Sequence, residues 1–236
     1  MESLGLCILA VLSLGACTTG VSNNSVLNKP NQTHKVVTQY PVETAILNVY
    51  TRAYSDQLYT LIDGQLVVID TKVTPKGAMV FNNQQVQGAE MVAITTVNGQ
   101  VVDKSVGINY FTLEPLVFHG FTSDVGEYSI ATQTKPIPKI ASIDDSSTYI
   151  TEQVYSDSRK RKKIKTYTQT WSLKRESNNT AWLCIESSEN LLLSYDPEGT
   201  STECYKINAQ GDILDSNVTI NSIEANGTEM ILFNSI

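Results

Sequence analysis

The chain has 236 residues, of which 41% are hydrophobic and 17% charged, and its formal net charge at pH 7 is −7. This composition argues against a charged disordered chain and a coiled coil, and the negative charge argues against a molecule built to hold nucleic acid. Thr, Val and Ile number 65 against 12 Ala, so the chain favours strands over helices.

The first part of the chain is an uncharged, mostly apolar run over residues 4–16. This run of 13 residues is too short to span a bilayer, which takes about 20 residues. It has the length of the apolar region of a secretory signal and ends in small residues, as a cleavage site does. We therefore expect residues 1–16 to be a signal peptide.

Cys17 follows this run directly. The stretch Leu14-Gly15-Ala16-Cys17 resembles the lipobox of bacterial lipoproteins, in which an aliphatic residue and two small residues precede the cysteine. The resemblance implies that the thiol of Cys17 carries diacylglycerol and that its amino group carries a further acyl chain such as palmitate. Because Thr18 and not Asp comes next, it also implies the outer membrane of the bacterial envelope, on its periplasmic or its surface side. The alternatives are an ordinary signal peptide with an incidental cysteine and a buried N-terminal segment.

Residues 17–35 are polar, rich in Ser, Asn and Thr, and follow neither the helix nor the strand period. Such a composition is typical of a flexible tether. Two or three acyl chains anchor a protein stably, whereas one alone binds reversibly. We therefore expect the membrane to be a partner through the covalent lipid, with the folded body starting near residue 36.

From residue 36 onward the pattern predicts an all-β, mainly antiparallel body, either a sandwich, a barrel or a half-barrel without a long amphipathic helix. Turn pairs such as Asn98-Gly99 separate the expected strands. The expected strands are Ala45–Tyr54, Gln65–Lys72, Met91–Val97, Ile108–Leu113, Glu127–Thr134, Tyr149–Tyr155, Ile164–Lys174, Thr180–Glu186, Asn190–Tyr195, Thr202–Ile207 and Ile213–Ile220.

One clear break divides this body. Pro136 and Pro138 prevent regular ladder pairing, and the stretch ends in acidic and Ser residues. We expect residues 134–147 to be a linker between two β-rich subdomains, 36–133 and 148–236. The alternative is a long connection within one sheet.

Two cysteines, Cys184 and Cys204, remain in the expected mature body. An even pair in an oxidising compartment favours a disulfide. The expected strand Asn190–Tyr195 would lie between them, however, and hold them apart by about twice the strand spacing of about 4.8 Å. The predicted bond therefore needs a bend or a crossing between sheets.

No catalytic constellation stands out in the sequence. His119 is the one plausible base for a Ser-His-Asp triad, yet no nucleophile motif accompanies it. No zinc-ligand spacing, phosphate loop or dinucleotide motif is present, so we expect no metal and no cofactor.

A basic run is the strongest local signal in the body. Six of the 17 basic residues fall within seven positions, namely Arg159, Lys160, Arg161, Lys162, Lys163 and Lys165. They lie between two expected strands, which predicts a hairpin tip. One interpretation is a solvated turn whose charges deter edge pairing, and the other is a docking point for an anionic lipid or an acidic envelope protein.

These features lead us to expect an outer-membrane-anchored lipoprotein with a non-enzymatic role in binding or envelope assembly. Two alternatives stay open. One is a periplasmic carrier of a lipid or another apolar ligand, and the other is a hydrolase that uses His119.

Overall fold

The computed structural model describes residues 36–189, 199–224 and 227–235. The expected signal peptide, Cys17, the expected tether and the expected strand Asn190–Tyr195 lie outside the described residues. The helix and strands of the described part are β1 (Gln39–Tyr40), α1 (Val42–Thr51), β2 (Tyr54–Ile62), β3 (Gln65–Phe81), β4 (Gln84–Val97), β5 (Gln100–Leu113), β6 (Leu116–Ser123), β7 (Tyr128–Gln133), β8 (Ala141–Ser142), β9 (Ser146–Tyr155), β10 (Lys163–Arg175), β11 (Thr180–Ser187), β12 (Thr200–Asn208), β13 (Ile213–Glu224) and β14 (Gly227–Ser235).

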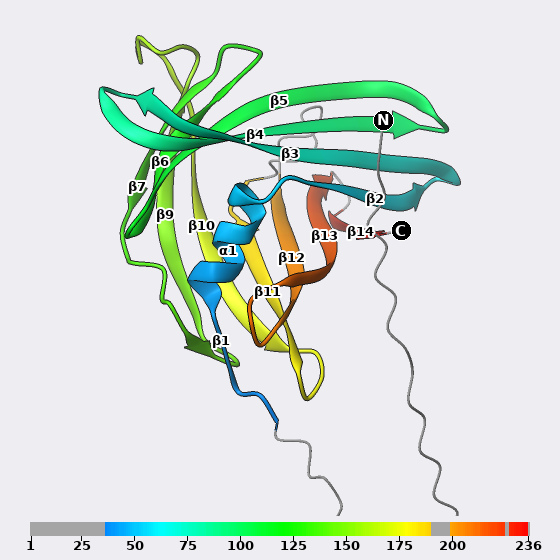
Figure 1. Cartoon of the computed structure of the whole chain (residues 1–236). Helices are drawn as coiled ribbons and strands as arrows, with labels where there is room; N and C mark the ends of the chain where they lie inside the picture. The colour runs from blue at the N-terminus through cyan, green and yellow to red at the C-terminus, as the bar shows by residue number, and fades with distance from the viewer. Residues whose placement is uncertain (1–35, 190–198, 225–226, 236) are drawn as a thin grey trace, which may run out of the picture. The chain divides into compact units, whose positions relative to one another are not determined.

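Twelve antiparallel strands close into a barrel (Figure 1). Their order follows the chain from β2 to β14, except that β8 leaves the barrel and pairs with β1 in a separate two-stranded sheet. The barrel closes where β14 pairs with β2 through Asn234↔Tyr59 and Ser235↔Leu58. The predicted all-β class is confirmed, and its form is a closed barrel instead of a sandwich or half-barrel.

Strands from both sides of residues 134–147 belong to this one barrel. β7 pairs with β9 over six residues, for example Ala131↔Glu152, and the described residues belong to one compact unit. The expected linker is itself packed, because Ile137 is buried and the backbone oxygen of Pro138 accepts a hydrogen bond from the N–H of Glu43. The strands on both sides therefore belong to one sheet, and residues 134–145 connect β7 to β9.

The prediction of a strand at Ala45–Tyr54 is wrong, because α1 covers most of that segment. Its many β-branched residues favour a strand locally. The buried positions Val42, Ala45, Ile46 and Val49, however, have the spacing of one helical face. Burial of that face against the barrel outweighs the local preference.

The strand β10 shows how the barrel sorts its side chains. Tyr167, Trp171 and Leu173 are all buried, as their alternation with Thr and Ser predicts. The residues between them, such as Thr168 and Thr170, are only partly buried. Since antiparallel partners share a face of the sheet, the register from strand to strand then identifies the inward positions all round the barrel.

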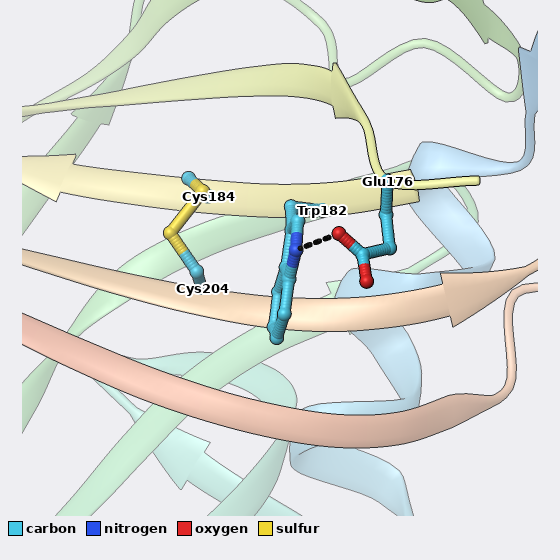
Figure 2. The surroundings of a disulfide bond; sticks show 4 residues. All are labelled: Glu176, Trp182, Cys184 and Cys204. Atoms are coloured by element: carbon cyan, nitrogen blue, oxygen red, sulfur yellow. Dashed lines mark hydrogen bonds between the residues drawn. A yellow bond between two sulfur atoms is a disulfide. The ribbon is translucent and has the colours of Figure 1, made fainter. Parts of the chain in front are cut away.

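The predicted disulfide between Cys184 and Cys204 is present, with the two Cα atoms 4.0 Å apart (Figure 2). The expected need for a bend is wrong, because β11 pairs directly with β12 and places the two cysteines opposite each other. Beside the bond, Glu176 accepts a hydrogen bond from Trp182 Nε1 and forms an ion pair with Lys206, both at 3.0 Å. Through Glu176, which lies between β10 and β11, these contacts link Trp182 of β11 to Lys206 of β12.

Candidate functional site

The helix α1 fills part of the barrel lumen. Its buried face belongs to one apolar cluster with inward residues of eight strands, including Val73, Phe111, Trp171 and Leu183. Beyond this face, Asn48 Nδ2 donates a hydrogen bond to the backbone oxygen of Gly211 at 2.8 Å. This contact holds α1 against the loop between β12 and β13.

Next to this cluster the lumen holds a cavity of about 290 Å³. Its lining combines apolar side chains with many polar ones, and α1 contributes Tyr50 to it. Its aromatic members include Tyr50, Tyr54, Phe118, Tyr167 and Tyr205. The charged members are Asp56, Glu127, Glu152, Lys165 and Glu203. A barrel wall of paired strands holds nearly all of these groups, so the cavity is built on a rigid frame.

Glu152 on β9 is the most buried of the charged groups, with 6% of its surface exposed. Ser129 Oγ donates a hydrogen bond to its Oε1, and Tyr167 Oη donates one to its Oε2 at 2.9 Å. Burial raises the pKa of Glu152, while these two hydrogen bonds and the charge of Lys165 oppose that rise. Both carboxyl oxygens therefore have protein partners.

Glu203 on β12 is partly buried and has a different environment. Tyr205 Oη donates a hydrogen bond to its Oε2 at 2.9 Å. Burial raises the pKa of Glu203, and this hydrogen bond is the one opposing contribution. No Lys or Arg forms an ion pair with it within the described part of the chain.

The six basic residues that the sequence groups together do not lie together. Lys165 is two residues into β10, opposite the buried Val154, and lines the cavity. The other five, Arg159 to Lys163, are exposed in and next to the loop between β9 and β10. The expected hairpin tip is present, but Lys165 belongs to the lumen and not to the tip.

Lys160 has a structural role within that tip. Its Nζ donates a hydrogen bond to Asn82 Oδ1 at 3.4 Å and lies 5.6 Å from the ring centroid of Tyr128. Tyr128 stacks in turn on Phe81, with the ring centroids 5.0 Å apart. The loop is thereby held against a small aromatic cluster, and its remaining basic residues face solvent.

His119 lies at a register shift between β5 and β6 and is partly buried. Its Nε2 is 3.4 Å from Thr112 Oγ1, and burial lowers its pKa. The described structure brings no carboxylate and no serine hydroxyl into hydrogen-bond contact with it. The arrangement needed for the hydrolase alternative is therefore not formed at His119 by these residues.

The sequence patterns did not single out Glu152, Glu203 and the tyrosines around them. A usable signal was present, because each glutamate occupies an inward, mostly apolar position of an alternating strand. Glu152 lies between Ile150 and Val154, and Glu203 precedes Tyr205 and Ile207 in the same alternation. A carboxylate in an apolar stripe either costs free energy or has a function.

Across residues 36–189, 199–224 and 227–235, no three His, Cys, Asp or Glu side chains gather in a way that would hold a metal ion. None of the helices in the described residues is long and apolar enough to cross a membrane. Comparison with known proteins finds no matching protein family, no matching curated protein and no matching solved structure.

Proposed function

We propose that this protein is anchored to the bacterial outer membrane through lipid on Cys17 and binds a small polar molecule inside its barrel, without catalysing a reaction. The cavity of about 290 Å³ is the observation that carries the binding role. It is close to the lower end of the range for small-molecule sites, which is about 300–1,000 Å³. The anchor rests on the lipobox resemblance at Leu14–Cys17.

The lining of the cavity favours a polar ligand over the lipid or apolar ligand of the carrier alternative. A lipid carrier needs a long, continuous apolar pocket. Here carboxylates, amides and hydroxyls such as Glu152, Asn109 and Ser105 interrupt the apolar surface. Polar groups at a few positions of a mostly preformed cavity supply orientation and specificity for a small polar molecule.

Blocking the lumen tests the binding role. Gly107 lines the cavity, and a Cβ added there would meet only the backbone oxygen of Thr122, at an ordinary 3.5 Å. Gly107→Phe therefore places a ring in the lumen, and Ala93→Phe on the neighbouring strand is a second blocking variant. Val102→Phe is the control, because Val102 lies on the same strand but is 54% exposed.

The probes are three molecules of matched shape: choline, 3,3-dimethylbutan-1-ol and 3,3-dimethylbutanoate. Binding to the full chain is measured by ligand-observed NMR. We expect at least one probe to bind the wild-type protein and the Val102→Phe variant, and to lose binding in Gly107→Phe and Ala93→Phe. Binding that survives both blocking variants, or the absence of binding by all three probes, would contradict the proposed role.

Fractionation tests the anchor. In a Gram-negative host, Cys17→Ala should move the protein from the membrane pellet to the soluble fraction, because the acyl acceptor is gone. Cys7→Ala is the matched control, since Cys7 lies within the expected signal peptide and should leave the pellet association unchanged. A Cys17→Ala protein that stays in the pellet would rule out lipid on this cysteine as the anchor.

A further inference from the structure

The cavity is unbalanced in charge. Its lining contains four carboxylates and one amine among the described residues: Asp56, Glu127, Glu152, Glu203 and Lys165. Ser216 Oγ donates a hydrogen bond to Asp56. A barrel interior has a lower dielectric than water, so an unbalanced carboxylate there has a strong attraction for a cation.

Glu152 is the carboxylate whose charge the protein already balances. Both of its oxygens accept hydrogen bonds, from Ser129 and Tyr167, and Lys165 is near enough to favour its charged form. A ligand cation has little to add at this position. The amine of Lys165 also repels a second cation there.

Glu203, unlike Glu152, has no positive charge beside it among the described residues. Its one hydrogen bond from a side chain comes from Tyr205, and no basic side chain of the described residues pairs with it. Four tyrosines lie close enough to Glu203 for its charge to affect them. Burial is the main cause of their raised pKa, and the charge of Glu203 raises the pKa further in Tyr50, Tyr54, Tyr149 and Tyr205. Three of these, Tyr50, Tyr54 and Tyr205, line the cavity with Glu203.

We infer that the molecule bound in the cavity is an organic cation, with its ammonium group placed between the Glu203 carboxylate and the rings of Tyr50, Tyr54 and Tyr205. Aromatic faces attract an ammonium group through the ring quadrupole, most strongly when the group is desolvated. A carboxylate beside those rings supplies the opposite charge. This inference rests on the proposed function and adds the chemical class of the ligand.

The matched probes separate the two claims. Choline and 3,3-dimethylbutan-1-ol have nearly the same shape and differ in charge, and 3,3-dimethylbutanoate has the opposite charge. We expect the full chain to bind choline about tenfold more tightly than the alcohol, and the carboxylate more weakly than either. If the alcohol binds as tightly as choline and the lumen-blocking variants abolish both, the binding role stands and the cation inference is wrong.

Two variants locate the site. In Glu203→Gln the preference for choline over the alcohol should fall to about twofold or less, because the opposite charge is removed. Glu186→Gln is the matched control, since Glu186 is exposed on β11 and the change in net charge is the same. Tyr54→Leu removes a ring and should weaken choline more than the alcohol. A Glu203→Gln protein that keeps the full preference for choline would overturn the assignment of Glu203.

Discussion

The two parts of the barrel lumen differ although the same strands build both. Along β10, Leu173 and Trp171 pack into the apolar cluster around α1, whereas Tyr167 and Lys165, further along the same inward face, line the cavity. Along β12, Ile207 likewise belongs to the α1 cluster, and Glu203 to the cavity. We call these parts the filled half and the hollow half.

The difference shows how different parts of one barrel lumen can provide stability and a binding site. A closed barrel of this many strands is too wide for its own side chains to fill, so something else must occupy the lumen. In the filled half, α1 supplies apolar side chains and the core is closely packed. In the hollow half α1 contributes Tyr50 alone to the lining, and the inward positions combine polar groups able to contact a ligand with Leu58 and Val218, which belong to a second apolar cluster. Side chains of the filled half should therefore contribute more to the free energy of unfolding than the polar groups that line the cavity, and those polar groups should determine the affinity for a ligand.

The largest expected effect is on the filled half. Leu173 is fully buried beside α1, so Leu173→Ala should lower the free energy of unfolding by about 2–5 kcal/mol. Met91→Ala is the comparison, because Met91 is only partly buried and lies at the edge of the same cluster, where it lines the cavity. It should cost only about 1 kcal/mol, since a void already borders the site. Urea denaturation followed by circular dichroism measures both, and equal losses would remove the distinction between the halves.

The disulfide should have the next largest effect. It joins β11, whose inward face contributes to the filled half, to β12, whose inward face contributes to both halves. Replacing Cys184 and Cys204 together by Ser should lower the free energy of unfolding by about 3 kcal/mol, through the greater freedom of the unfolded chain. Thermal unfolding with and without a reductant measures it. A reductant that leaves the wild-type transition unchanged would show that the bond contributes little.

Local patterns were enough to predict much of the wall of the barrel. The expected strands Tyr149–Tyr155, Ile164–Lys174 and Thr180–Glu186 match β9, β10 and β11 to within a few residues. In each, alternation of apolar and polar residues follows directly from one face being buried. Closure of the barrel could not be predicted in this way, because it depends on pairing between residues far apart in sequence, such as Tyr59 and Asn234.

The errors at α1 and Lys165 have a common physical source. In both cases the prediction depends on residues that are adjacent in sequence, whereas in the fold the segment contacts residues from distant strands. The β-branched content of α1 favours a strand locally, but burial of one helical face against the apolar lumen favours the helix more. Lys165 belongs by sequence to a basic run, but β10 begins at Lys163, and the strand alternation then turns Lys165 inward. The cavity itself could not be predicted from sequence, because a void depends on side chains from many strands at once.

The third prediction uses pH to probe the balanced carboxylate of the hollow half. Burial raises the folded-state pKa of Glu152 above its ordinary value of 4.5, although Ser129, Tyr167 and Lys165 oppose the rise. An acid with a raised folded-state pKa adds stability below the unfolded value, and that contribution is lost as the pH rises through the folded value. The free energy of unfolding changes by about 1.4 kcal/mol for every tenfold difference between the acid dissociation constants of the folded and unfolded states.

Glu152→Gln should therefore gain stability relative to the wild type as the pH rises from about 4.5 towards 7. Glu186→Gln, at an exposed position of β11, should follow the wild-type curve. The other groups facing Glu152 are the hydroxyls of Ser129, Tyr149 and Tyr167 and the amine of Lys165. Urea titrations across this range measure the difference, and parallel curves for both variants would contradict the buried state of Glu152.

The smallest effect on stability is expected outside both halves, at the loop between β9 and β10. Replacing the exposed Arg159, Arg161, Lys162 and Lys163 by Gln should change the free energy of unfolding by less than about 0.5 kcal/mol and leave choline binding unchanged. Lys160 is kept, because its contact with Tyr128 holds the loop in place.

The same replacements should weaken binding to vesicles of equimolar phosphatidylglycerol and phosphatidylcholine. This binding is measured in the Cys17→Ala chain, so that no acyl anchor contributes. Each basic side chain near an anionic surface contributes about 1 kcal/mol at low salt, and salt screens that attraction. If the chain with the four replacements binds the vesicles as tightly as the chain without them at low salt, the loop is a solvated turn and not a docking point.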